Sequence, residues 1–344
     1  MVDLLPIPNS IDFSTGYLRR SKEIDSVQVS APARILRAVA RMPLAGFPIA
    51  VAIAETTSEQ PRLNDSYAYR LVVNETGVRI GADTQWGALA ALVTLVQLTS
   101  DDTVPCCTIN DAPRFQWRGL MVDVARHFIS LETLRRTLDT MGYFKLNVLH
   151  LHLSDDQAFR FRGTTLPELA SAEHYTADEL TALVAHAADR GIRIVPELDV
   201  PGHTTSWLVV HPEWGSGGDV SASSAFGPHE TVLDPTRSDV MDALGRIFGE
   251  IAEVFPDQYI HFGGDEVRSN EWRKSAAIRN YMRSQKIDDE SSLQADFNRR
   301  LIVELERFGK KPVGWDEILH PSLPDSVVIQ CWRGMRGRDE ALQA

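Results

Sequence analysis

The spacing of apolar positions changes near Pro113, and this change divides the chain into two regions. Before it, residues 66–73 and 78–82 read as short strands on either side of residues 74–77, Asn-Glu-Thr-Gly, a sequence typical of a hairpin turn. After this hairpin the apolar residues recur at helical spacing. No group of catalytic residue types stands out in this region. We therefore predict a small non-catalytic α/β domain over residues 1–112.

After Pro113, short apolar strands alternate with amphipathic helical stretches. Six strands are predicted, at residues 119–124, 147–153, 193–198, 259–263, 312–315 and 327–332. Thr176 and Glu179 make a capping box for one of the helices, and Gly191 stands where that helix ends. Strand-helix alternation predicts a parallel sheet, and six such units favour a (β/α) TIM-type barrel over a doubly wound sheet. The predicted fold class is thus α/β, with a barrel over residues 113–344.

Polar and aromatic side chains gather at the end of each predicted strand. They are Asp123, Arg126, His127, His150, His152, Asp155, Asp156, Glu197, Asp199, His203, Asp265, Glu266, Trp315, Asp316, Glu317 and Trp332. Barrel enzymes carry their active sites at the C-terminal ends of the strands. Solvated loop tips would favour Lys, Ser and Asn over Trp, His and paired acids. The pattern therefore predicts a catalytic site at this edge of the sheet.

Composition and charge narrow the choice of partners and compartment. The formal charge of −12 argues against nucleic acid or an anionic membrane as the main partner, because both repel an acidic surface. No apolar run approaches the ~20 residues of a spanning helix, and the first residues lack a signal-peptide pattern. The three cysteines, Cys106, Cys107 and Cys331, form no disulfide framework and no metal-type spacing. We expect a cytoplasmic protein with a neutral substrate.

The motifs now carry a resemblance to a known family. They are Trp117-Arg118-Gly119, Asp123, Arg126-His127-Phe128, the run from Lys145 to Gln157, Asp199-Val200-Pro201-Gly202-His203, and His261-Phe262-Gly263-Gly264-Asp265-Glu266-Val267. In this order they resemble the family 20 glycoside hydrolases, the β-N-acetylhexosaminidases. The resemblance implies hydrolysis of terminal β-linked N-acetylhexosamines from a carbohydrate substrate, without cofactor or metal. The small first domain is similar to the non-catalytic domain that precedes the barrel in that family.

The mechanism that the resemblance implies suits two adjacent acids. Ordinary retaining glycosidases hold two carboxylates ~5 Å apart on opposite sides of the scissile bond, which sequence neighbours are poorly placed to do. In the substrate-assisted variant, the 2-acetamido oxygen of the sugar attacks its own anomeric carbon, so one general acid and one orienting carboxylate suffice. By resemblance, Glu266 is the acid/base and Asp265 holds the acetamido group. Glu266 must begin protonated, which requires burial or negative neighbours.

Further roles follow from the same resemblance. His203 and Asp155 would form a polar relay beside Glu266. The alternative for His203 is a structural role, as a histidine packed within a loop. Arg126 would bind the ring hydroxyls of the terminal sugar, and an ion pair between Arg126 and Asp123 is compatible with that role.

Aromatic residues complete the expected pocket. Trp315 and Trp332 match positions that wall the pocket and stack on the sugar ring, although a lone Trp at a strand end is more often core. His127, His150 and His152 are interpreted as mostly structural, because His-x-His places both rings on one face of a strand.

The resemblance is incomplete at the C-terminal end. The family's barrel has eight strands, and the motifs of the last two, a Tyr-x-Asp/Asn segment and a later Trp with a nearby Glu, have no counterpart before Ala344. Four explanations stay open: a shortened product, a natural truncation, strands donated by a partner copy, or a remnant that binds sugar without cleaving it. Because an open barrel exposes sheet edges, we hypothesise a homo-oligomer that covers the open edge.

Two rival functions remain. A metal-dependent barrel hydrolase would use His150, His152, His203 and Asp265 as ligands. A non-catalytic amino-sugar-binding protein would bind N-acetylglucosamine without turnover. The residues present do not distinguish N-acetylglucosamine from N-acetylgalactosamine as the preferred sugar, and the natural glycan stays open.

Overall fold

The computed structural model describes residues 4–22, 31–55, 58–218, 220–227 and 229–343. The chain folds as two compact units, each assembled from segments that are separate in the sequence. The first comprises Met1–Leu120, Leu131–Leu149 and Leu183–Arg193, and the second comprises Met121–Ser130, His150–Ala182 and Ile194–Ala344.

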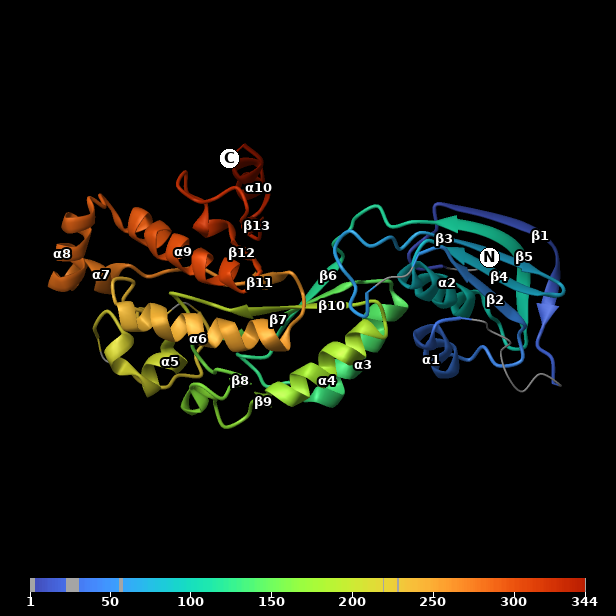
Figure 1. Cartoon of the computed structure of the whole chain (residues 1–344), viewed down its shortest axis with the longest axis horizontal. Helices are drawn as coiled ribbons and strands as arrows, with labels where there is room; N and C mark the ends of the chain where they lie inside the picture. Colours follow the sequence, from blue (N-terminus) through green and yellow to red (C-terminus); the bar gives the residue numbers. More distant parts are fainter. Residues whose placement is uncertain (1–3, 23–30, 56–57, 219, 228, 344) are drawn as a thin grey trace. The chain divides into compact units, whose positions relative to one another are not determined.

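A five-stranded sheet forms the centre of the first unit (Figure 1). Its strand order is β1 (Ser10–Arg19), β5 (Thr103–Asp111), β3 (Tyr69–Asn74), β4 (Gly77–Ala82) and β2 (Ile49–Ile53). The predicted hairpin is confirmed, since β3 and β4 pair antiparallel. Its turn is held by Asn74, whose Oδ1 accepts hydrogen bonds from the backbone N–H groups of Thr76 and Gly77.

Two helices complete the core of this unit, α1 (Ala33–Arg41) and α2 (Gln85–Leu98). Helix α2 begins where the Thr84 hydroxyl accepts hydrogen bonds from the N–H groups of Trp86 and Gly87. Nearly all of its residues are buried. Such all-round burial is typical of a core helix and explains why its sequence lacks a polar face.

A six-stranded sheet is built from strands that lie between Gly119 and Gln330. Its order is β13 (Val328–Gln330), β12 (Lys311–Trp315), β11 (Tyr259–His261), β10 (Arg193–Leu198), β7 (Val148–Ser154) and β6 (Gly119–Asp123). The pairs β10–β11, β11–β12 and β12–β13 are parallel. All six predicted strands are therefore present, and strands that follow one another along the chain lie side by side, as in a (β/α) barrel.

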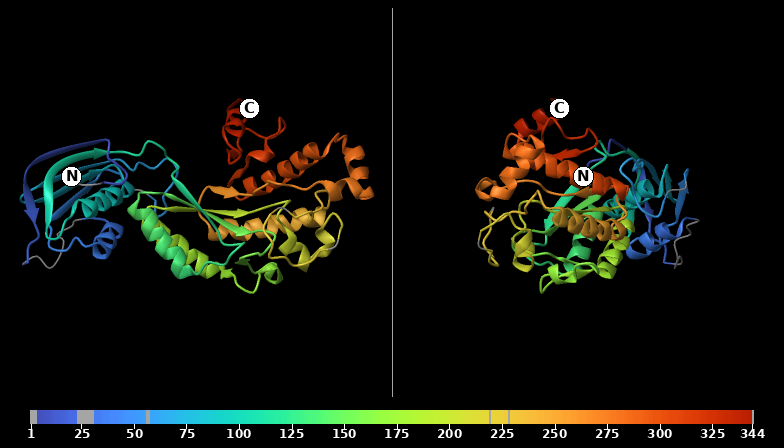
Figure 2. Two further views of the ribbon diagram at one scale, coloured as in Figure 1. Left: turned by 180° about the vertical axis from the view of Figure 1, so that it is seen from behind. Right: turned by 60° about the vertical axis from the view of Figure 1, so that its left-hand side comes forward.

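Helices connect these strands, as the strand-helix alternation predicted. They are α3 (Leu131–Tyr143), α4 (Ala177–Ala188), α5 (Thr205–Val210), α6 (Ser238–Val254), α7 (Asn270–Lys274), α8 (Ala276–Gln285), α9 (Glu290–Arg307) and α10 (Met335–Gln343), with short strands β8 (Phe161–Arg162) and β9 (Tyr175–Thr176). The views agree that α6 and α9 lie side by side (Figures 1 and 2). The capping box is confirmed: Thr176 N–H donates to Glu179 Oε2, and Glu179 N–H donates to Thr176 Oγ1.

The predicted fold class is confirmed: an α/β chain whose parallel sheet is an incomplete TIM-type barrel, preceded by a smaller α/β domain. The boundary between residues 112 and 113 stays a prediction. Among the described helices, none is long and apolar enough to cross a membrane.

Candidate active site

Acidic residues lie at or just past the C-terminal ends of five strands in the second unit. Asp123 ends β6, Asp155 follows β7, Asp199 follows β10, and Asp316 follows β12. Asp265 comes four residues after the end of β11. Because neighbouring parallel strands end at the same edge of a sheet, side chains far apart in sequence meet there.

Backbone geometry after β11 places the two adjacent acids. Gly263 and Gly264 have φ angles of 71° and 91°, a region that favours glycine. A Cβ atom at Gly263 would overlap the Asp199 carboxylate, and Gly264 N–H donates to Asp199 Oδ1 over 2.9 Å. Glu266 itself has a φ of 49°, which is uncommon for a residue with a side chain. The turn is therefore built around Asp199, and it sets where Glu266 points.

His203 connects these acids to the end of β7. Its Nδ1 lies 3.2 Å from Asp155 Oδ1, and its Nε2 lies 3.5 Å from Glu266 Oε2 and 3.8 Å from Asp265 Oδ2. Burial disfavours the charged ring, but the carboxylates of Asp199, Asp155 and Asp156 outweigh it and raise the pKa of His203 to about 12. The His203–Asp155 relay expected from the sequence is thus assembled, with a charged ring facing Glu266.

Asp155 is the acceptor at the centre of this cluster. Its Oδ2 accepts from Arg126 over 2.7 Å and from His152 Nε2 over 2.8 Å. Burial opposes its negative charge, but the hydrogen bonds from His152 and His203 hold its pKa well below the ordinary value. Arg126 also forms the anticipated ion pair with Asp123, at 3.0 Å. The Arg126 side chain keeps 26% exposure, so part of the guanidinium faces solvent.

Asp199 and Asp265 form a close pair of acids. Asp199 is buried, and burial together with the negative charge of Asp265 raises the pKa of Asp199 well above its ordinary value. Within the described residues, Asp265 Oδ1 is buried and accepts no hydrogen bond. His203 Nε2 is also buried and has no hydrogen-bond partner. The site thus presents an acceptor that no side chain satisfies.

Glu266 is less enclosed than the sequence argument required. Its side chain is 34% exposed, against 15% for Asp265 and 1% for His203. The carboxyl of Glu266 is therefore open to solvent on one side.

The two tryptophans occupy different environments. Trp315 is buried, and its indole Nε1 donates to Glu197 Oε1 over 2.9 Å. Trp332 is 52% exposed, lies beyond the end of β13, and donates to the carboxylate of Glu317. Burial, with a smaller contribution from the charge of Asp265, raises the pKa of Glu317.

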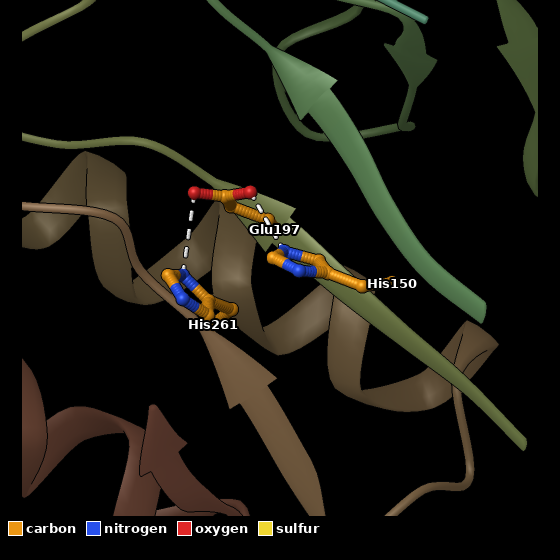
Figure 3. Close-up of side chains that lie close together, drawn as sticks. All are labelled: His150, Glu197 and His261. Atoms are coloured by element: carbon orange, nitrogen blue, oxygen red, sulfur yellow. Dashed lines mark hydrogen bonds and ion pairs between the residues drawn. The ribbon is translucent and has the colours of Figure 1, made fainter. Parts of the chain in front are cut away.

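Sequence reasoning missed the importance of a buried group beneath this site. Glu197 is fully buried and lies between His150 and His261 (Figure 3), with His152 also bonded to it. The sequence did carry one signal, a charged residue inside an apolar strand. Such a residue is almost never buried unless it is paired, so its position indicated buried partners.

The ligands of the metal alternative are not gathered in one cluster. Among the described residues, His150 groups with Glu197 and His261, whereas His203 groups with Asp265 and Glu266. In the first group, His150 Nε2 and Glu197 Oε2 already form a hydrogen bond with each other, over 2.7 Å. Of the four residues proposed as zinc ligands, His203 and Asp265 share one group, His150 belongs to another, and His152 belongs to none of the groups found among the described residues.

The chain is similar in sequence to curated beta-hexosaminidases. Beta-hexosaminidase subunit beta of Mus musculus is 33% identical over 304 residues, which cover 83% of this chain and 55% of that protein. Beta-hexosaminidase A of Caenorhabditis elegans is 35% identical over 299 residues, covering 81% and 54%. The chain spans about half the length of the curated relatives it matches.

Solved structures give the same answer for the fold. The chitobiase of Flavobacterium johnsoniae superposes with a TM-score of 0.90 at 31% identity, covering 96% of this chain and 55% of that one. A family 20 exo-β-N-acetylglucosaminidase of Vibrio harveyi, in complex with N-acetylglucosamine, gives 0.86 at 29%, covering 99% and 59%. Residues 2–112 match domain 2 of glycosyl hydrolase family 20, and residues 115–344 match its catalytic domain. The chain therefore belongs to glycosyl hydrolase family 20.

Proposed function

We propose that this protein removes terminal non-reducing β-linked N-acetyl-D-hexosamine residues by a retaining, substrate-assisted mechanism. The observation that carries the proposal is the buried, donor-less Oδ1 of Asp265 directly beside the partly open carboxyl of Glu266. An acetamido N–H is the group that would satisfy this oxygen. The names of the relatives, beta-hexosaminidase and exo-β-N-acetylglucosaminidase, support the same substrate class.

In this proposal each acid has one chemical task. In the first step the acetamido oxygen bonds to the anomeric carbon, the glycosidic C–O bond breaks, and Glu266 gives its proton to the leaving oxygen. Asp265 accepts the acetamido N–H and stabilises the positive charge of the oxazolinium ion. Water then adds to the anomeric carbon and returns a proton to Glu266. The bond between the acetamido oxygen and the anomeric carbon breaks in this step, which opens the oxazolinium ring. A bound sugar would cover Glu266 and favour its neutral form before the reaction.

The remaining residues have supporting roles in this proposal. His203 and Asp155 hold Glu266 in place through the relay, and the exposed part of Arg126 binds ring hydroxyls. Trp315 and Trp332 wall the pocket and stack on the sugar ring. That a second copy covers the outer strands of the six-stranded sheet is also a proposal, and a strictly monomeric mass in solution would contradict it.

Hydrolysis of a chromogenic β-N-acetylglucosaminide by the 344-residue chain tests the function. We expect turnover that a thiazoline mimic of the cyclised intermediate inhibits and that a chelator leaves unchanged. The same assay with the galactosamine epimer measures the sugar preference.

Other outcomes of this assay point to the rival functions. A well-folded chain that binds the thiazoline without turnover would favour the amino-sugar-binding protein. Loss of activity on chelation, with metal found by elemental analysis, would favour the metal-dependent hydrolase.

A further inference from the structure

Glu197 is a buried carboxylate that the proposed mechanism does not use. It lies in β10, where its sheet partner across the strand pair is His261 of β11. Its Oε2 accepts from His150 Nε2 over 2.7 Å and from His152 Nδ1 over 2.6 Å, both from β7. Its Oε1 accepts from Trp315 Nε1 of β12 over 2.9 Å. One carboxylate thus bonds to side chains of two other strands at once.

Hydrogen-bond geometry constrains the protonation of the surrounding rings. Both nitrogens of His152 face carboxylate oxygens, Glu197 on one side and Asp155 on the other, and an imidazolium ring donates to both. His261 differs, because its Nδ1 accepts from Gly263 N–H over 3.0 Å and so lacks a proton in this arrangement. The 3.3 Å approach of His261 Nδ1 to Glu197 Oε1 is then packing, not a hydrogen bond. Glu197 balances the charge of His152.

The bonds of Glu197 reach both functional parts of the site. From its Oε2, an unbroken series of contacts runs through His152, Asp155 and His203 to Glu266. From its Oε1, a single bond holds the indole of Trp315, the proposed wall of the sugar pocket. The acid/base relay and the pocket wall therefore share one buried anchor, which lies beneath the site and touches neither reacting acid.

We propose that Glu197 is a positioning residue for the reaction: its two carboxylate oxygens hold the relay that ends at Glu266 and the Trp315 wall in one fixed geometry. The inference rests on the proposed function. In this inference Glu197 neither contacts the substrate nor transfers a proton.

Glu197→Gln tests this assignment because the amide fits the side-chain volume but not the bonding pattern. A glutamine has one acceptor oxygen and one donor NH₂ group, so its NH₂ must face either the two histidine donors or the indole N–H. We expect kcat to fall by about 10–100-fold, the range seen when partners that orient functional side chains are lost. We expect KM to rise about threefold or more, because the indole loses its acceptor or its alignment.

The pH profile separates positioning from a loss of folded protein. The charged groups facing His152 are Glu197, Asp155 and Arg126, which lies 3.2 Å from its Nε2. Burial lowers the pKa of His152, but the two carboxylates outweigh it and raise that pKa to about 10. Without the Glu197 charge, His152 loses its proton at lower pH, so the high-pH limb of kcat/KM should move to lower pH. A merely structural role would leave this limb in place.

Asp257→Asn is the matched control, a buried carboxyl in the bend before β11, at the opposite end of that strand from the site. It should change stability without changing kcat per active site, KM or the pH profile. Active sites are counted by titration with the thiazoline. A Glu197→Gln protein with the kinetic constants and pH profile of the unaltered chain overturns the inference.

Two further measurements keep the test decisive. If Glu197→Gln does not fold, Glu197→Asp keeps the charge but shortens the reach, and it should lower kcat/KM about tenfold or more while the pH profile persists. Wild-type kinetics in a folded Glu197→Asp protein would overturn the inference. Failure of the proposed function is distinguishable, because then the unaltered chain itself neither hydrolyses the glycoside nor binds the thiazoline.

Discussion

Glu266→Gln is expected to lower kcat for a β-N-acetylglucosaminide by about 10²–10⁴-fold, the usual contribution of a general acid/base. The amide keeps the volume of the side chain but cannot deliver a proton to the leaving oxygen. Because Glu266 is partly exposed and its Oε2 lies 3.5 Å from His203 Nε2 without a hydrogen bond, the fold and thiazoline affinity should persist. Steady-state kinetics and calorimetric titration of the thiazoline measure the two effects separately.

A leaving-group comparison sharpens this result. An activated nitrophenolate needs little protonation, so the variant should lose less rate with it than with a natural disaccharide. Glu253→Gln, on the exposed face of α6, is the matched control and should leave both rates unchanged. Equal losses with both substrates would remove Glu266 from the role of general acid.

Asp265→Asn should lower kcat by about 10²–10³-fold, the cost commonly measured when one preorganised group at a developing charge is lost. The carboxylate faces the acetamido nitrogen as it becomes positive, and an amide offers only a dipole. Neighbouring Asp199 stays in place, and its raised pKa should return toward the ordinary value once the Asp265 charge is gone. Kinetics over pH, with the thiazoline affinity, would show the loss.

The thiazoline supplies the discriminating readout for Asp265. Because it mimics the cyclised intermediate, its affinity should fall with Asp265→Asn but stay nearly constant with Glu266→Gln. Asp242→Asn, exposed on α6, controls for the substitution itself. An Asp265→Asn protein with unchanged affinity and turnover would contradict the assignment of the acetamido group to this residue.

Local sequence determined the elements that position the site. The Thr176–Glu179 capping box, the Asn74 turn and the six apolar strands were predicted because caps, turns and strand alternation depend on neighbours within a few residues. The order of strands followed as well, because successive strand-helix units place each strand beside the previous one. The clustering of acids at the strand ends was predicted for the same reason.

Side-chain partnerships across strands were decided only by the tertiary structure. His150 and His152 were interpreted as mostly structural, and Glu197 as one polar strand end among several, yet the three form the anchor of the relay. Their meeting depends on the register between β7 and β10 and on burial that removes competing water. The open side of Glu266 and the raised pKa of Asp199 likewise depend on which groups surround them in space. Sequence spacing determines which residues share an edge of the sheet, whereas three-dimensional packing determines which of them exchange a hydrogen bond or a proton.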